Sequence, residues 1–207
     1  DWGPRFVTAG IWKTVVLKAW KAIRITNVNI VQTKIENDTA FLNVGFEMQS
    51  HNDTLDELEL KILNDTSQAG KIQKSISLEA GINNITFDFN IPNPNLWWPN
   101  GMGKPSLYDL EAILSIDDKT FDSSTTRFGI RTIELVTDKD SIGKNFYFKV
   151  NDVPVFIKGA NYIPQNSFVT EVTEEDHKSL IKSAVDANMN MMRVWGGGIY
   201  ENDIFYD

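Results

Sequence analysis

The order strand, helix, strand near the C-terminal end constrains the fold more than any other feature of the sequence. Residues 155–161 and 191–195 are short apolar runs, and residues 173–188 between them have the spacing of an amphipathic helix. A right-handed crossover makes two such strands parallel, so that their carboxyl ends lie at one edge of the sheet. Few residues follow the second strand, and a parallel sheet does not stop there, so we expect the sequence to end inside a repeating βα domain.

Local signals support this unit and the residues on either side of it. Thr173 and Asp176 have the spacing of a capping box, which predicts the first turn of the helix. Residues 146–157 predict a β-hairpin, because two apolar runs flank an Asn-Asp pair, and residues 200–207 predict the start of a second helix. The apolar face expected on the first helix consists of Leu180, Ile181, Ala184, Val185 and Met189.

Residues 21–134 have a different pattern. They contain seven short runs, and in several of these runs apolar and polar residues alternate. Leu42, Val44, Phe46 and Met48 illustrate the alternation, because they share one face of a strand. About seven short strands at this spacing are typical of an immunoglobulin-like β-sandwich, and an all-β barrel is the alternative. The predicted strands span residues 23–35, 40–51, 58–63, 71–79, 82–91, 107–116 and 119–130.

The first twenty residues predict a strand pair, or the end of one, without a core of its own. The apolar residues that indicate it lie within residues 10–17. We therefore expect residues 1–20 to be the tail of a preceding domain, residues 21–134 to be the sandwich, and residues 135–207 to be the beginning of a βα domain.

Composition and charge exclude several classes of function. The formal net charge of −8 disfavours binding to nucleic acid or to an anionic membrane surface, because phosphate contacts need clustered Lys and Arg, and no apolar run reaches transmembrane length. The chain has no Cys, which excludes disulfides, thiolate metal ligands and a Cys nucleophile. The two histidines, His51 and His177, lie in polar surroundings, so we expect both at the surface. No metal-ligand spacing occurs, so neither a metal nor another cofactor is expected.

The loop at residues 92–105 contains two adjacent tryptophans among Pro and Gly residues. Aromatic faces stack on sugar rings, so Trp97 and Trp98 are candidates for a sugar platform. The alternative is that they anchor the loop onto a neighbouring domain, and this is the interpretation that we prefer.

The residues at the ends of the two predicted parallel strands form the candidate site. Active sites of (β/α)8 barrels lie at the carboxyl ends of the strands, where this sequence places Asn161 and Tyr162 on the first strand and Arg193 and Trp195 on the second. A desolvated guanidinium needs an anionic partner, so a carboxylate on another strand is expected near Arg193; a structural ion pair is the alternative. Trp195 would form a wall of a sugar subsite or pack between strands.

Other residues near this edge carry weaker signals. The triple glycine at residues 196–198 matches neither a dinucleotide-binding nor a P-loop spacing, and we interpret it as room for close backbone approach at a pocket rim. Glu201 and Asp203 flank the predicted second helix, where acidic residues are common because of the helix dipole. No two carboxylates form a convincing catalytic pair, and the two histidines offer no Ser-His-Asp arrangement.

Several segments of the sequence resemble glycoside hydrolase family 2, and most closely its β-mannosidases. The Phe-Gly-Ile-Arg and Lys-Gly-Ala-Asn segments are shared widely in the family, whereas the Asp-Trp-Gly-Pro opening and the Arg-Val-Trp-Gly-Gly-Gly run are narrower. Exo-acting glucosaminidases share part of the latter run. The segments lie at residues 1–5, 10–13, 96–101, 107–108, 127–131, 158–164 and 193–201, so that the resemblance covers essentially the whole chain.

The resemblance implies a mainly β chain with three parts. These are the tail of a galactose-binding-like jelly-roll domain, an immunoglobulin-like β-sandwich, and the first βα units of a (β/α)8 TIM barrel. It also implies a retaining exo-glycosidase that acts on a terminal β-mannose through two carboxylates about 5 Å apart. In the family both glutamates come from later barrel strands, so they are expected beyond Asp207, and the chain by itself is expected to be inactive.

Four residues match positions near the sugar in the family. Asp1 matches an aspartate that reaches the terminal sugar, where one carboxylate accepts two hydroxyl groups. Arg193 matches the arginine that steadies the nucleophile, and Trp195 and Asn161 match lining or supporting positions. The resemblance therefore implies that Asp1 and Trp195 bind the sugar, that Arg193 and Asn161 support them, and that the partner is a carbohydrate, a β-mannoside.

Two other functions remain open at this point. A related family 2 enzyme, such as an exo-β-glucosaminidase or a β-galactosidase, is similar in sequence to part of the chain. A glycan-binding or scaffolding module would instead use Trp97 and Trp98 of the sandwich. The absence of Cys favours a bacterial protein, for which a periplasmic or secreted location is expected; a cytoplasmic location, or a lysosomal one in a eukaryote, is the alternative.

Overall fold

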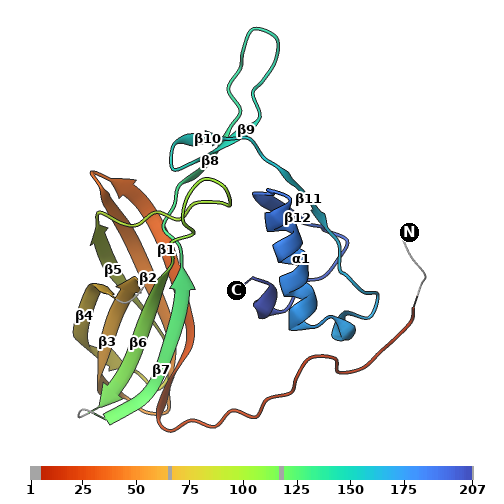
Figure 1. Ribbon diagram of the computed structural model, residues 1–207. Coiled ribbons are helices and arrows are strands. Elements are labelled where there is room, and N and C mark those ends of the chain that lie inside the picture. Colours follow the sequence, from red (N-terminus) through yellow and green to blue (C-terminus); the bar gives the residue numbers. More distant parts are fainter. Residues whose placement is uncertain (1–5, 65–66, 117–118, 207) are drawn as a thin grey trace.

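The computed structural model describes residues 6–64, 67–116 and 119–206, and the chain is mainly β. Seven long strands form two facing sheets, and a smaller part with one α-helix lies beside them (Figure 1). The first sheet has the order β1 (Ile23–Glu36), β2 (Thr39–Ser50) and β5 (Gly81–Pro92). The second has the order β4 (Ser67–Leu78), β3 (Thr54–Asn64), β6 (Tyr108–Ile116) and β7 (Lys119–Phe128). Every strand pair in both sheets is antiparallel.

The hydrophobic core lies between these two sheets. On β2 the predicted alternation is complete, because Leu42, Val44, Phe46 and Met48 are buried and each residue between them is partly exposed. Leu114 of β6 belongs to the same cluster from the opposite sheet. Each large side chain buried here contributes about 1.5–3 kcal/mol, so a register slip that turned this face to solvent is strongly disfavoured. All seven predicted strands are present, and in the described residues they pair as two separate sheets, which disfavours the barrel alternative.

A small antiparallel sheet joins the sandwich to the helical part. It consists of β8 (Ile133–Val136), β9 (Tyr147–Val150) and β10 (Val153–Val155), and β9 with β10 is the predicted hairpin. The turn residues Asn151 and Asp152 have φ angles of 50° and 65°. Positive φ at both central residues is what the right-handed twist of a two-residue hairpin requires, and it explains the Asn-Asp pair.

The strand, helix, strand unit is present with the predicted parallel pairing. β11 (Gly159–Tyr162) lies parallel to β12 (Met191–Val194), and α1 (Glu174–Asp186) connects them. Thr173 caps the helix, and the capping box with Asp176 is confirmed. Because the main-chain and side-chain hydrogen bonds from Thr173 stabilise the carboxylate, they hold the pKa of Asp176 below its usual range.

The predicted strand at residues 155–161 is in fact two strands, β10 and β11. Between them the chain stops pairing with β9 and begins to pair with β12, and the side chain of Asn190 bonds to the residues where this change occurs. Its Oδ1 accepts from the Lys158 main-chain N–H at 2.8 Å, and its Nδ2 donates to the Phe156 carbonyl at 3.0 Å. These bonds replace the ladder that a continuous strand would have made.

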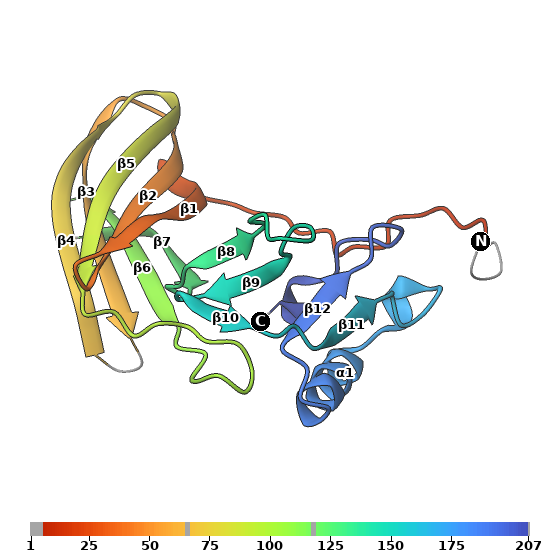
Figure 2. The same cartoon turned by 90° about the horizontal axis from the view of Figure 1, so that it is seen from above.

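Two other predictions of secondary structure were wrong. Residues 10–17 form no strand, because residues 6–20 run as an extended, largely exposed segment along which no described strand supplies a ladder (Figures 1 and 2). Of the predicted helix at residues 200–207, the described residues 200–206 contain only a short 3-10 helix, η2 (Asp203–Phe205). A second such helix, η1 (Val169–Glu171), precedes α1. None of the described helices has the length and apolar character needed to cross a bilayer.

Candidate functional site

The parallel pairing of β11 with β12 brings two predicted site residues side by side. Asn161 lies opposite Arg193 in the register, and the Arg193 Nη1 donates to the Asn161 Oδ1 at 3.0 Å. This bond holds the guanidinium at the carboxyl edge of the sheet, as a right-handed crossover predicts. The Arg193 side chain is exposed beside a sheet that has only two strands in the described part of the chain, so its desolvation in a (β/α)8 barrel stays a prediction. The carboxylate expected to face it stays a prediction.

Trp195 lies directly after β12, and its position depends on the glycines that follow. The side chain is partly buried, and its main-chain N–H donates to the Tyr162 carbonyl at 2.9 Å. The indole lies so close to Gly197 that a Cβ there would approach ring atoms within 3.0 Å, which real Cβ atoms essentially never do. At Gly198 a Cβ would meet the Pro164 ring at 3.0 Å, whereas at Gly196 it would meet nothing within 4 Å. The predicted close backbone approach is therefore confirmed at Gly197 and Gly198 but not at Gly196.

A buried polar cluster lies immediately behind this loop. The Tyr162 hydroxyl donates to the Glu201 Oε1 at 2.8 Å, and the Glu201 Oε2 lies 3.9 Å from the His177 Nε2. All three side chains are buried. The Phe205 ring covers the cluster, with its centroid 4.7 Å from that of Tyr162 and 5.5 Å from that of His177. Burial and the bond to the Glu201 carboxylate raise the pKa of Tyr162 to about 12, so its hydroxyl stays a proton donor at any physiological pH.

His177 corrects a prediction, because only His51 of the two histidines is at the surface. His177 is 3% exposed, although polar residues surround it in the sequence. It precedes Leu180 and Ile181 by one helical turn and therefore continues the apolar stripe of α1, a signal that the sequence contains. Nothing in the sequence indicated the role of Glu201, whose partner Tyr162 is 39 residues away.

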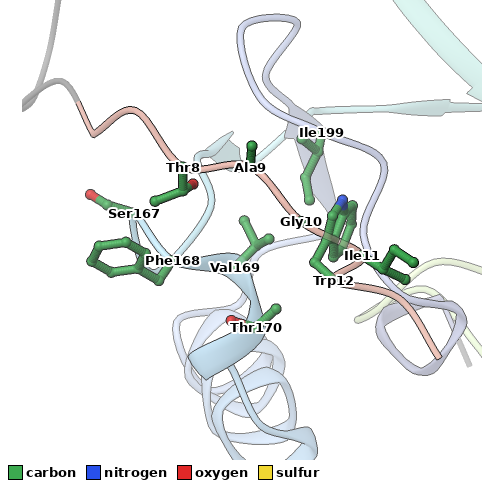
Figure 3. Close-up of a pocket in the computed structure, with 10 residues that line it drawn as sticks. All are labelled: Thr8, Ala9, Gly10, Ile11, Trp12, Ser167, Phe168, Val169, Thr170 and Ile199. Carbon is green, nitrogen blue, oxygen red and sulfur yellow. The ribbon is translucent and has the colours of Figure 1, made fainter.

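A hollow lies where the N-terminal segment passes over this edge of the βα unit (Figure 3). Its volume is about 560 Å³, and the Phe6 ring anchors the segment against Phe168, with the centroids 4.9 Å apart. Ile199 lies above Trp12 at one end of it (Figure 3). The lining residues are Thr8, Ala9, Gly10, Ile11, Trp12, Ser167, Phe168, Val169, Thr170 and Ile199. The segment thus reaches the same edge as the strand ends, but the predicted sugar ligand Asp1 lies outside the described residues.

The paired tryptophans take part in packing within and beyond their loop. Trp97 lies under the Arg131 guanidinium, 4.7 Å from its ring centroid, and its carbonyl accepts from the Asn151 amide at 3.0 Å. A Cβ at Gly103 would lie 2.8 Å from two atoms of the Trp98 side chain. Further along the loop, the Asn100 amide donates to the Met189 carbonyl at 3.0 Å, beyond the last turn of α1. These contacts support the preferred interpretation, in which the loop docks onto the helical part.

In the part of the chain that the structure describes, no group of three or more His, Asp or Glu side chains is arranged to hold a metal ion. The described side chains and main-chain groups at this edge include a guanidinium, amides, hydroxyls, an indole and one buried carboxylate. Such groups donate and accept hydrogen bonds and stack, which are the interactions that orient a sugar.

Comparisons with known proteins agree along the whole length of the chain. Beta-mannosidase B of Aspergillus oryzae is 35% identical over 207 residues, and beta-mannosidase of Capra hircus is 34% identical over 220 residues. Each alignment covers 100% of this chain and 24% of the relative, so that the chain spans about a quarter of the length of these proteins. The crystal structure of beta-D-mannosidase from Dictyoglomus thermophilum is similar with a TM-score of 0.93 and 39% identity, over 100% of this chain and 25% of that one.

The family assignment follows from the match to a family model. The model of glycosyl hydrolases family 2 matches residues 23–131, which is more than half of the chain and includes both sheets of the sandwich. The resemblance inferred from sequence motifs is thereby confirmed: the chain belongs to glycosyl hydrolases family 2.

Proposed function

We propose that the chain is part of a retaining, exo-acting glycosidase that removes terminal β-D-mannose residues from carbohydrates. The observation that carries this proposal is the identity of 34–39% along the whole chain to three proteins whose names specify β-mannosidase. The similarity includes the loop after β12, which the proposed sugar site requires. The absence of Cys is the reason for proposing a bacterial protein with a periplasmic or secreted location.

The proposed architecture has three parts, with boundaries taken from the sequence. Residues 1–20 would be the tail of a jelly-roll domain, residues 21–134 an immunoglobulin-like sandwich, and residues 135–207 the first βα units of a (β/α)8 barrel. The two facing sheets support the second part. The parallel pair β11 and β12 with its crossover helix supports the third, because it is the repeating unit of such a barrel.

The proposed roles of the site residues follow from their places at the strand ends. Trp195 would stack on the terminal mannose, and Asp1 would accept hydrogen bonds from its hydroxyl groups. Arg193, oriented by Asn161, would hold the nucleophilic carboxylate in its ionised form, because a neighbouring positive charge favours that form.

The two catalytic carboxylates are proposed to lie beyond Asp207. In a retaining mechanism one carboxylate attacks the anomeric carbon while the other, as an acid, protonates the leaving oxygen; the second then acts as a base for the water that releases the sugar. The 207-residue chain would supply the pocket wall and the support for the nucleophile, and by itself would not hydrolyse a mannoside.

Hydrolysis of a panel of chromogenic β-glycosides tests the proposal. The 207-residue chain is compared with a form that continues through a complete barrel, and activity is expected only in the longer form and only on the β-mannoside. In that form Arg193→Ala should lower kcat/KM by about 100-fold or more, whereas Arg127→Ala, which removes an exposed ion pair of the sandwich, should change it less than about twofold. Activity of the short chain, or of the long form on another glycoside alone, would contradict the proposal.

A further inference from the structure

Tyr162 holds both ends of the glycine loop that carries Trp195. Its main-chain carbonyl accepts from the Trp195 N–H at 2.9 Å, where the loop leaves β12. Its hydroxyl donates to the Glu201 carboxylate at 2.8 Å, where the loop ends. One residue of the neighbouring strand therefore fixes the first and the last residue of the segment 195–201.

The Glu201 carboxylate is buried, and its other oxygen faces α1. The side chain is 5% exposed, that of His177 is 3% exposed, and 3.9 Å separate the carboxylate Oε2 from the His177 Nε2. The Gln165 amide nitrogen lies 3.3 Å from the His177 Nδ1. An amide nitrogen only donates, so in this contact the Nδ1 accepts, as it does in the tautomer that carries its proton on Nε2. That Nε2 makes no hydrogen bond within the described structure, and the Glu201 Oε2 lies 3.9 Å from it.

Between the two clamped ends the Gly198 N–H donates to the Trp195 carbonyl at 3.2 Å and Gly198 lies against the Pro164 ring, but these contacts lie inside the loop or on one side of it. Gly196 to Gly198 have no side chains, and Tyr200 is 90% exposed. The position of the Trp195 indole depends on the path of this loop, because the ring lies directly against Gly197. A main chain with three consecutive glycines has a large conformational freedom to lose, so an external clamp is the means by which the indole is held in one place.

From this geometry we propose that the Tyr162–Glu201–His177 cluster is a positioning device that presents Trp195 to the mannose ring. None of the three residues touches the sugar in this proposal; they act through the loop. The inference rests on the proposed function for the identity of the sugar. Whether the cluster holds the loop in one conformation does not depend on the identity of the sugar, and it is measured separately.

Hydrogen exchange of the peptide at residues 195–201 measures the clamp without any sugar. Tyr162→Phe removes the hydroxyl and keeps both the ring that packs on Phe205 and the carbonyl that binds Trp195. Exchange of the loop is expected to become at least tenfold faster. Tyr200→Phe is the matched control, since it makes the same chemical change at an exposed position of the same loop, and it should leave exchange unchanged within about twofold.

Steady-state kinetics on 4-nitrophenyl β-D-mannoside test whether the clamp acts through Trp195. In a form of the protein that hydrolyses this substrate, Tyr162→Phe is expected to raise KM about tenfold and to change kcat less than about threefold, because a misplaced stacking partner weakens binding. Combined with Trp195→Ala, the same substitution should add less than about twofold to the loss caused by Trp195→Ala alone, since the residue through which it acts is already absent.

Each outcome decides one of the two proposals. Faster exchange together with the non-additive kinetics supports the positioning role. Unchanged exchange, or an effect that multiplies fully with that of Trp195→Ala, overturns it. If Tyr162→Phe does not fold, Glu201→Gln replaces it, because glutamine keeps an oxygen for Tyr162 and turns an N–H donor toward His177; unchanged exchange in that variant also overturns the clamp. If the unaltered protein hydrolyses no mannoside, the proposed function is wrong, whereas the exchange result still tests whether the cluster holds the loop.

Discussion

Substitution of Gly159 by alanine tests the parallel pairing on which the whole site depends. Gly159 lies opposite Met191 in the register of β11 with β12. A Cβ at this position would lie 2.9 Å from the Met191 carbonyl carbon and closer still to its oxygen, whereas ordinary contacts begin near 3.4 Å. The obstacle is main chain, which cannot rotate away, so the two strands must separate at this end. Overpacking costs about 1–3 kcal/mol and a lost ladder hydrogen bond about 1 kcal/mol, so a loss of about 2–4 kcal/mol is expected.

Hydrogen exchange reports this loss where it occurs. A tenfold change in an equilibrium corresponds to about 1.4 kcal/mol, so the amides of β11 and β12 should exchange about 30-fold faster or more, while those of the sandwich strands keep their rates. Gly196→Ala is the matched control, because a Cβ there meets nothing within 4 Å; it should leave exchange unchanged or slow it slightly. Equal exchange in the two variants would refute the close approach of β11 to β12.

Three further predictions concern other parts of the molecule. Leu114→Ala should lower the free energy of unfolding by about 2–5 kcal/mol in urea titrations, because the side chain is 0% exposed in the core, whereas Val31→Ala, at 45% exposure, should cost much less. Asp152→Gly should raise the free energy of unfolding by about 0.5–1 kcal/mol, because glycine adopts the φ of 65° without strain. Tyr162, with its pKa raised to about 12, favours the folded state below pH 10, and this contribution should fade as pH rises from 10 through 12 in alkaline unfolding curves, but not in Tyr162→Phe.

The parts of the fold that the sequence predicts well are those decided by neighbouring residues. Leu42 to Met48 reveal a half-buried strand because successive side chains point to opposite faces. The capping box of Thr173 and Asp176 closes within three residues, and the hairpin turn is set by an Asn-Asp pair that tolerates positive φ. Each signal is complete within one element, so no knowledge of the rest of the chain is needed.

The predicted strand at residues 155–161 shows the limit of predictions made from neighbouring residues alone. Its apolar residues are compatible with one continuous strand, but the chain changes partner in the middle, from β9 to β12. The side chain that bridges the change, Asn190, lies 32 residues after Lys158. Residues 10–17 fail for the same reason, because an apolar run becomes a strand only where another strand supplies a ladder.

The candidate site was predicted in its arrangement rather than in its environment. A right-handed crossover requires Asn161 and Arg193 to lie at the same edge of the sheet, and they do, joined by a hydrogen bond of 3.0 Å. Burial depends instead on what packs around a residue. Arg193 is therefore exposed, whereas His177 is buried by contact with Glu201 and Phe205, which follow it by 24 and 28 residues in the printed sequence.

The sandwich loop at residues 92–105 and the N-terminal segment that leads into the sandwich contact opposite ends of the βα unit. A crossover helix runs opposite to its strands, so the C-terminal end of α1 lies away from the carboxyl edge that carries the site. At that end the Asn100 amide donates to the carbonyls of Val185, in the last turn of the helix, and of Met189, which follows it. At the site edge, the segment that leads into β1 lies against Phe168 and lines the hollow beside Ile199 (Figure 3). A displacement of the sandwich would therefore move the helix end through Asn100 and shift the segment that lines the hollow, which gives the sandwich a role in the proposed glycosidase even though no catalytic residue is predicted in it.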